Sequence, residues 1–245
     1  MTQKIVYLHR KDINNPGDWF SSPYHYFKDF EGEVIDLTEP ARPITCDILI
    51  IGGGGLFSTN DWMHRLWLWT TRITAGKKVI WGAGIDEEFF NHPVLNDFDL
   101  KGFRQTNTPF DFVPCVSCLH TQLDTNIPSN KIASISGGTD HLIVGSGINK
   151  RTIPGQHMNN KSILSKPVGS FEKIINQIKI HNKITTASYH VWYWSKLLEK
   201  NVKIDYKSRY RKPLVEKFYT LPKVTNLKHY RELNLDFAKR VFTHG

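Results

Sequence analysis

Cysteine is scarce in this sequence, and long apolar runs are missing. The 245 residues include only three cysteines, Cys46, Cys115 and Cys118, which cannot form the disulfide framework of a small secreted domain. No apolar stretch approaches the roughly 18 residues of a membrane-spanning helix. The first residues lead directly into a strand-like run, without the apolar segment of a signal peptide. We therefore expect a cytoplasmic protein.

Several common ligand motifs are also missing. Four glycines, Gly52–Gly55, follow an apolar run, but no Gly-Lys-Ser/Thr follows them and they do not form G-x-G-x-x-G, so no nucleotide fingerprint is present. Cys115, Cys118 and His120 lie close together, but zinc usually needs a second pair of ligands. We expect no metal site and regard these cysteines as buried loop residues, with zinc or redox chemistry as minor alternatives.

The charge of the chain is strongly basic, with a formal net charge of +9 and a pI of about 9.4. Such a balance favours an anionic partner, such as nucleic acid, an acidic lipid surface, an acidic glycan or a phosphorylated substrate. The densest basic segment is Lys203–Lys217, which is either a solvated face or an anion-facing rim. No nucleic-acid-binding module is recognisable, so nucleic acid is not expected as a partner. Peripheral contact with the inner face of an anionic membrane stays open.

Short apolar runs alternate with helical patterns, which is typical of parallel α/β architecture. In the first half we expect a helix over Asp61–Ala75 and strands over Lys4–His9, Glu33–Leu37, Asp47–Ile51, Lys78–Trp81, Leu100–Arg104 and Phe110–Val113. The pattern then restarts, with strands over Lys131–Ser136, Thr152–Gln156, Lys183–Ala187 and Val202–Ile204 and helices over Ser170–Ile180 and His190–Lys200. Two Rossmann-like domains, residues 1–122 and 123–245, would then face a cleft, and the helical tail Lys228–Phe242 would pack back on the first.

Two segments lie where open α/β sheets bind ligands, at the ends of strands. Gly52–Gly55 either forms a tight strand–helix turn or lines the ligand site, since glycine lets a backbone approach a ligand closely. Thr186–His190 joins a strand to a helix whose first amides favour anions, and His190 is placed to protonate a substrate, unless it is structural. Asp18 is expected to cap a helix after the Asn14–Asp18 loop.

Tryptophan is concentrated on the first long helix. Trp62, Trp67 and Trp69 fall within or beside the helix that follows the glycine loop. Core packing explains them without a special role, and stacking on a sugar ring is the alternative.

The order and spacing of these segments resemble those of polysaccharide pyruvyl transferases. Asn14–Asp18 is similar to an N-x-G-D entry motif, Asp47–Phe57 to the third strand and glycine loop, and Val79–Gly84 to the next strand and turn. Arg104 falls where the family places an arginine after a short strand. Thr186–His190 is similar to a Thr-Ser-Arg-x-His segment. The resemblance extends from Lys4 to about Phe218.

This resemblance implies two Rossmann-like domains arranged as in GT-B glycosyltransferases, with the acceptor on the first domain and the donor on the second. It also implies transfer of a pyruvyl group from phosphoenolpyruvate, a co-substrate, to a surface polysaccharide or a lipid-linked precursor, giving a ketal without any cofactor. The implied catalytic residues are His190 and Asp18. The implied donor-binding residues are Arg104, Ser188, Tyr189, Gly137 and Gly138. The implied acceptor-binding residues are Asn14, Gly17, Gly53, Gly54 and Gly55.

The sequence departs from the family pattern at two positions. Ser188 stands where the family has an arginine, and serine cannot grip a carboxylate or phosphate with a fixed charge. Gln105 replaces an acidic residue after Arg104. A different cation must therefore substitute, or the donor differs. The alternatives are a nucleotide-sugar-dependent glycosyltransferase of GT-B type and a non-catalytic glycan- or nucleic-acid-binding derivative of the fold.

Overall fold

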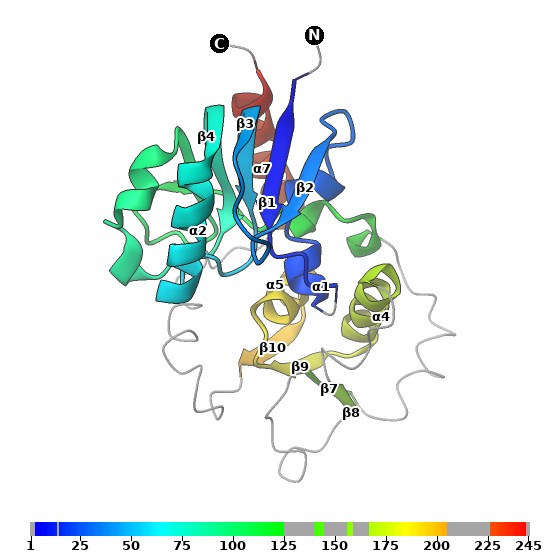
Figure 1. The fold of residues 1–245 in the computed structure, drawn as a ribbon. Helices are drawn as coiled ribbons and strands as arrows, with labels where there is room; N and C mark the ends of the chain where they lie inside the picture. The colour runs from blue at the N-terminus through cyan, green and yellow to red at the C-terminus, as the bar shows by residue number, and fades with distance from the viewer. Residues whose placement is uncertain are drawn as a thin grey trace.

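The structure is a computed structural model that describes residues 3–13, 15–124, 140–144, 156–158, 167–204 and 226–243 (Figure 1). It contains two parallel sheets, one of six strands and one of four. The predicted α/β class with a Rossmann-like parallel sheet is confirmed. In the described ranges, no helix is both long and apolar enough to cross a bilayer.

The larger sheet has the strand order β2-β1-β3-β4-β5-β6, and every neighbouring pair is parallel. Its strands are β1 (Ile5–His9), β2 (Gly32–Asp36), β3 (Ile44–Gly52), β4 (Ile73–Ala83), β5 (Leu100–Phe103) and β6 (Asp111–Phe112). All five residues of β1 are buried, as expected for a central strand covered on both faces. Because the strands are parallel, the residues that follow them gather at one edge.

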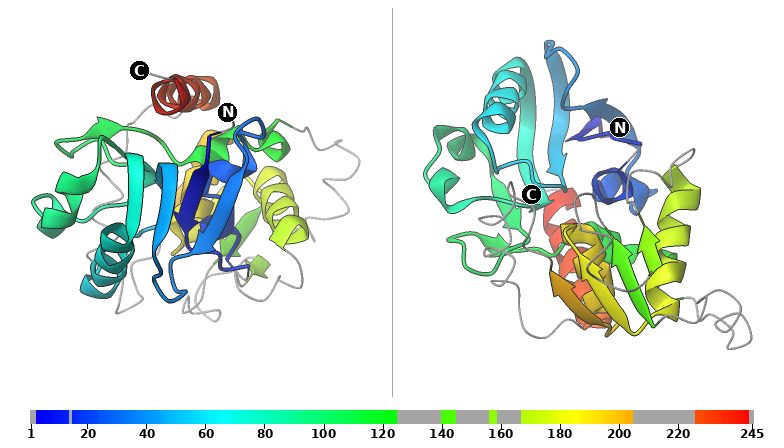
Figure 2. Two further views of the ribbon diagram at one scale, coloured as in Figure 1. Left: turned by 45° about the horizontal axis from the view of Figure 1, so that its top comes forward. Right: turned by 90° about the horizontal axis from the view of Figure 1, so that it is seen from below.

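Helices cover both faces of this sheet. Helix α2 (Asn60–Arg72) lies on one face and the C-terminal helix α7 (Leu227–Phe242) on the other (Figure 2). The second half of α7 buries Phe237, Val241 and Phe242 against a core of β1, β3 and β4 residues. The Trp81 indole N–H also donates to Asn234 Oδ1 at 2.8 Å. The helical tail therefore packs back on the first sheet, as its periodicity predicted.

The smaller sheet has the order β10-β9-β7-β8, again parallel. It consists of β7 (His141–Val144), β8 (Gln156–Met158), β9 (Lys183–Thr186) and β10 (Asn201–Ile204), with helices α4 (Pro167–Ile180) and α5 (Tyr189–Leu197). The remaining helical segments are short: α1 (Pro16–Trp19), η1 (Pro23–His25), η2 (Glu87–Phe89), η3 (Pro93–Asp97), η4 (Val116–Leu119) and η5 (Thr121–Leu123). Strand β7 was not predicted, and the predicted strand Lys131–Ser136 lies outside the described residues.

A shared core joins the two sheets. Phe20, beside α1, lies 4.8 Å from Phe171 of α4, measured between ring centroids. The Trp194 indole N–H of α5 donates to Ser117 Oγ at 3.0 Å, and Tyr193 donates to the Cys115 carbonyl at 2.9 Å. Helix α5 thus lies between the carboxyl edge of the larger sheet and the smaller sheet (Figure 1).

The predicted boundary between the first long helix and the strand after it was wrong. The expected helix extended to Ala75, but α2 ends at Arg72 and β4 begins at Ile73. Residues Ile73–Ala75 pair with Ile44–Cys46 of β3. The β-branched Ile73 and Thr74 favour an extended backbone, and long-range pairing with β3 overrides the helical periodicity that continues from α2.

Candidate functional site

The residues that follow β1, β3, β4 and β5 meet the start of α5 at the carboxyl edge of the larger sheet. A Cβ atom built on Gly17 would lie 2.2 Å from His190 Nδ1, and one built on Gly54 would lie 3.3 Å from Asp18 Oδ1. One built on Gly55 would lie 3.8 Å from Arg104 Nη2. The structure therefore brings together most of the site residues predicted from the sequence.

Arg104 is the central cation of this site. It follows β5, is only 6% exposed, and places its guanidinium carbon 3.5 Å from the centroid of the Tyr189 ring. A Cβ at Gly84 would lie 2.7 Å from Arg104 Nη2, so glycine at that position leaves room for the guanidinium. In the described part of the chain, Arg104 Nε and Nη1 are buried without a hydrogen-bond partner. Burying a guanidinium whose N–H groups lack acceptors costs free energy, and an anionic ligand would lower that free energy by accepting hydrogen bonds from them.

The glycine loop after β3 forms a tight turn and also borders Arg104 and Asp18. Gly53 and Gly54 have φ angles of 57° and 67°, which disfavour any side chain. A Cβ at Gly53 would lie 2.2 Å from the Ser21 carbonyl oxygen, so this backbone passes directly against the segment after α1. The loop is therefore a tight turn, and its residues also lie beside Arg104 and Asp18.

Asp18 lies inside α1 and does not cap the helix that was predicted after it. The N-cap residue is Asn15, whose side-chain amide donates to Asp18 Oδ2 at 2.8 Å. The prediction failed because Pro16, with its fixed φ, starts the helix two residues earlier. Burial raises the pKa of the Asp18 carboxyl to about 6, and the nearby positive charge of Arg104 opposes that rise. Asp18 can therefore gain or lose a proton near neutral pH.

His190 is the second residue of α5 and packs against Gly17. Burial, and then the positive charge of Arg104, hold the pKa of His190 well below its usual range. Its Nε2 is buried and has no hydrogen-bond partner among the residues that the structure describes. His190 is therefore a neutral imidazole beside an arginine.

The two residues before His190 differ in their surroundings. Tyr189 is buried beneath Arg104, and burial raises the pKa of its hydroxyl far above the usual value. Ser188 is the N-cap of α5, but its side chain makes no capping hydrogen bond; its N–H donates to Thr186 Oγ1 at 3.0 Å. Three further predicted site residues, Asn14, Gly137 and Gly138, lie outside the described residues, as does Lys203–Lys217 beyond Ile204.

The sequence analysis missed polar residues at the end of β1 and directly after it. His9 is 1% exposed, and burial together with His25 lowers its pKa to about 3. Arg10 lies 3.2 Å from Asp36 and 3.7 Å from Asp12, and both Arg10 and Asp12 influence the ionisation of Asp18. Their position at the carboxyl end of an apolar strand could have identified them as candidate site residues, because the same criterion identified Arg104.

The cysteines near this site are buried thiols. Cys115 and Cys118 are fully buried, and burial raises the pKa of Cys118 to about 12, so its thiol stays protonated. Within the described ranges, no cluster of three or more histidine, cysteine or acidic side chains could hold a metal ion.

Comparison with known proteins supports the fold. The structure resembles the crystal structure of a functionally uncharacterized protein from Klebsiella pneumoniae subsp. pneumoniae NTUH-K2044, with a TM-score of 0.54 and 18% sequence identity. The match covers 89% of this chain and 87% of the Klebsiella chain, so it includes both sheets. No protein-family model matches the chain, and no curated protein matches its sequence.

Proposed function

We propose that the protein is a transferase that moves a pyruvyl group from phosphoenolpyruvate to a saccharide, on a GT-B-like pair of Rossmann-like domains. The observation that carries the proposal is the buried guanidinium of Arg104, which has two donor groups without partners in the described structure. Phosphoenolpyruvate supplies a carboxylate and a phosphate, and either accepts paired hydrogen bonds from a guanidinium. Under this proposal Arg104 alone supplies the fixed positive charge to which an arginine at position 188 would otherwise contribute.

The electrostatics favour Asp18, and not His190 as the sequence suggested, as the group that protonates the donor. A pair of titratable groups whose surroundings separate their pKa values suits acid and base roles. The carboxyl of Asp18, with its pKa raised to about 6, is the proton donor, because negative charge on the donor raises that pKa further. His190 is a neutral imidazole, and it can accept a proton once the negative charges of bound phosphoenolpyruvate offset the charge of Arg104.

The reaction follows from these roles. Asp18 gives a proton to the methylene carbon of phosphoenolpyruvate, which makes the central carbon electrophilic. A sugar hydroxyl attacks that carbon while His190 takes its proton, and inorganic phosphate then leaves with the electron pair of the C–O bond. A second hydroxyl of the same sugar closes the ketal and returns its proton to the Asp18 carboxylate, while His190 gives the proton it has taken to the departing phosphate. One phosphoenolpyruvate and two hydroxyls therefore give one ketal and one phosphate.

Calorimetric titration with phosphoenolpyruvate tests the proposal on the wild type, Arg104→Met and Arg72→Met. Arg72 is an exposed arginine at the end of α2 and serves as the matched control. Loss of charge-assisted hydrogen bonds should weaken binding about 10- to 100-fold in Arg104→Met and leave Arg72→Met unchanged. Removing an unpaired buried charge should not lower the free energy of unfolding, so weaker binding would not reflect misfolding.

Two results would overturn the proposal. Binding of nucleotide sugars in place of phosphoenolpyruvate would move the assignment to glycosyl transfer. Equal binding of phosphoenolpyruvate by Arg104→Met would remove Arg104 from the donor site. If donor binding is established, phosphate release in the presence of saccharides and the methyl signal of the ketal in NMR spectra then report the transfer itself.

A further inference from the structure

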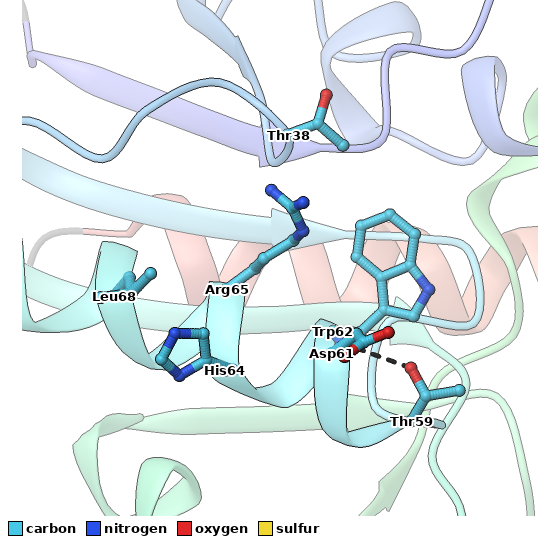
Figure 3. Close-up of a pocket in the computed structure, with 7 residues that line it drawn as sticks. All are labelled: Thr38, Thr59, Asp61, Trp62, His64, Arg65 and Leu68. Atoms are coloured by element: carbon cyan, nitrogen blue, oxygen red, sulfur yellow. Dashed lines mark hydrogen bonds between the residues drawn. The ribbon is translucent and has the colours of Figure 1, made fainter.

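A groove of about 750 Å³ lies between α2 and the residues after β2 (Figure 3). Thr38 follows β2 and Thr59 precedes α2, so the groove begins at the edge of the sheet at which Arg104 follows β5. Its volume is within the roughly 300–1,000 Å³ of small-molecule sites in proteins. A smaller hollow of about 240 Å³ continues it and shares Thr38, Arg65 and Leu68 with it. Together the residues that line the two hollows extend along α2 from Thr59 to Trp69, which is long enough for a ligand of more than one sugar ring.

An aromatic ring and two opposite charges line this groove. The indole of Trp62 stands beside Arg65, whose guanidinium points toward Thr38 (Figure 3). Asp61 and Arg65 are four residues apart on α2, yet neither has an ion-pair partner in the part of the chain that the structure describes. A hydrogen-bond acceptor, a hydrogen-bond donor and an apolar ring face are thus available together.

This set of groups fits a neutral saccharide. The apolar face of a sugar ring packs on an indole, and its hydroxyls donate to a carboxylate and accept from a guanidinium. The two formal charges of Asp61 and Arg65 cancel, so the groove does not select an anion, in contrast to the unpaired cation at Arg104.

The groove is connected to the Arg104 site at both of its walls. Thr59, at the start of α2, follows Ser58, whose hydroxyl donates to the Gly55 carbonyl at 2.5 Å. On the opposite wall, Arg10 donates to Thr38 Oγ1 at 3.3 Å, and its charge influences the ionisation of Asp18. A saccharide lying in the groove would therefore extend toward the proposed reaction centre.

We infer that this groove binds a neutral oligosaccharide, with Trp62 as the stacking platform and Asp61 and Arg65 as the hydroxyl-binding pair. The role of that oligosaccharide as the acceptor rests on the proposed function, whereas its binding does not. The acceptor would then carry no charge of its own before pyruvylation.

An array of neutral and acidic oligosaccharides tests this inference, with the affinity for the best neutral glycan then measured by calorimetry. The variants are Trp62→Ala and Arg65→Ala. The controls on the same helix are Arg72→Ala and Trp67→Phe, which keeps an aromatic ring against the groove-lining His64. Trp67 is 46% exposed, and neither control residue lines the groove. Each groove variant should weaken binding about tenfold, and each control less than about twofold. Because Trp62 also packs on the core, Arg65→Ala keeps the test valid if Trp62→Ala unfolds.

The possible outcomes separate this inference from the proposed function. It is wrong if the wild type binds no neutral glycan, prefers acidic glycans or nucleotides, or loses as much affinity in the controls as in the groove variants. Arg104→Met should lose phosphoenolpyruvate and keep the glycan, and Arg65→Ala should do the reverse. Glycan binding without phosphoenolpyruvate binding would therefore refute the proposed function alone.

Discussion

Replacing Asp18 by asparagine isolates the free-energy cost of holding a carboxylate beside the glycine loop. Asparagine has nearly the same shape, and its side-chain oxygen can still accept the hydrogen bond that Asn15 donates at 2.8 Å. The change therefore removes the charge and retains the contact. Because the pKa of Asp18 rises from 3.8 to about 6 on folding, the ionised form destabilises the folded state.

The size of this effect follows from the pKa. A pKa that is about two units higher in the folded than in the unfolded state destabilises the folded state by about 3 kcal/mol once Asp18 is ionised in both states. The penalty develops as the pH rises from the unfolded value toward the folded value. Asp18→Asn should therefore be more stable than the wild type by about 1 kcal/mol near pH ~4.5 and by about 3 kcal/mol near pH ~8.

Urea denaturation across this pH range measures the difference directly. Glu88→Gln serves as the control, since Glu88 is an exposed carboxylate on η2 and its loss should change the free energy of unfolding little. A variant that is less stable than the wild type at pH ~8, or a difference that does not grow with pH, would refute the argument. Under the proposed function, the same variant also loses transferase activity, because asparagine cannot donate the proton.

Two further substitutions test the packing that builds the site. Gly17→Ala places a Cβ 2.2 Å from His190 Nδ1, so the imidazole must move. We expect the free energy of unfolding, measured by calorimetry, to fall by about 1–3 kcal/mol, and by less than ~1 kcal/mol in the control Gly55→Ala. An equal fall in both variants would contradict the close packing of Gly17 on His190. Asn234→Ala removes the acceptor, at 2.8 Å, of the buried Trp81 indole N–H and leaves a cavity under α7. We expect the free energy of unfolding, measured by urea denaturation, to fall by about 2–4 kcal/mol. A fall below ~1 kcal/mol would show that the hydrogen bond between Trp81 and Asn234 is dispensable.

The sequence by itself determined the α/β class and the parallel strands of the larger sheet, because strand and helix patterns are local. The runs Ile5–His9 and Ile48–Gly52 are buried on both faces, so they could be read as central parallel strands without any knowledge of their partners. It also determined the edge at which Arg104 and the Gly52–Gly55 loop lie, since residues after parallel strands share one edge. Boundaries such as the end of α2 were less certain, because pairing with β3 competes with helical periodicity there.

Only the tertiary structure decided the electrostatics of the site and the presence of the groove. The sequence showed that Asp18, Arg104 and His190 were candidates, but their burial depends on contacts between segments more than 80 residues apart in the chain. That burial raises the pKa of Asp18, lowers that of His190 and leaves two Arg104 donors without partners in the described structure. Likewise, Trp62, Trp67 and Trp69 have the same chemistry, and only folding separates a groove-lining ring from an exposed one and a core one.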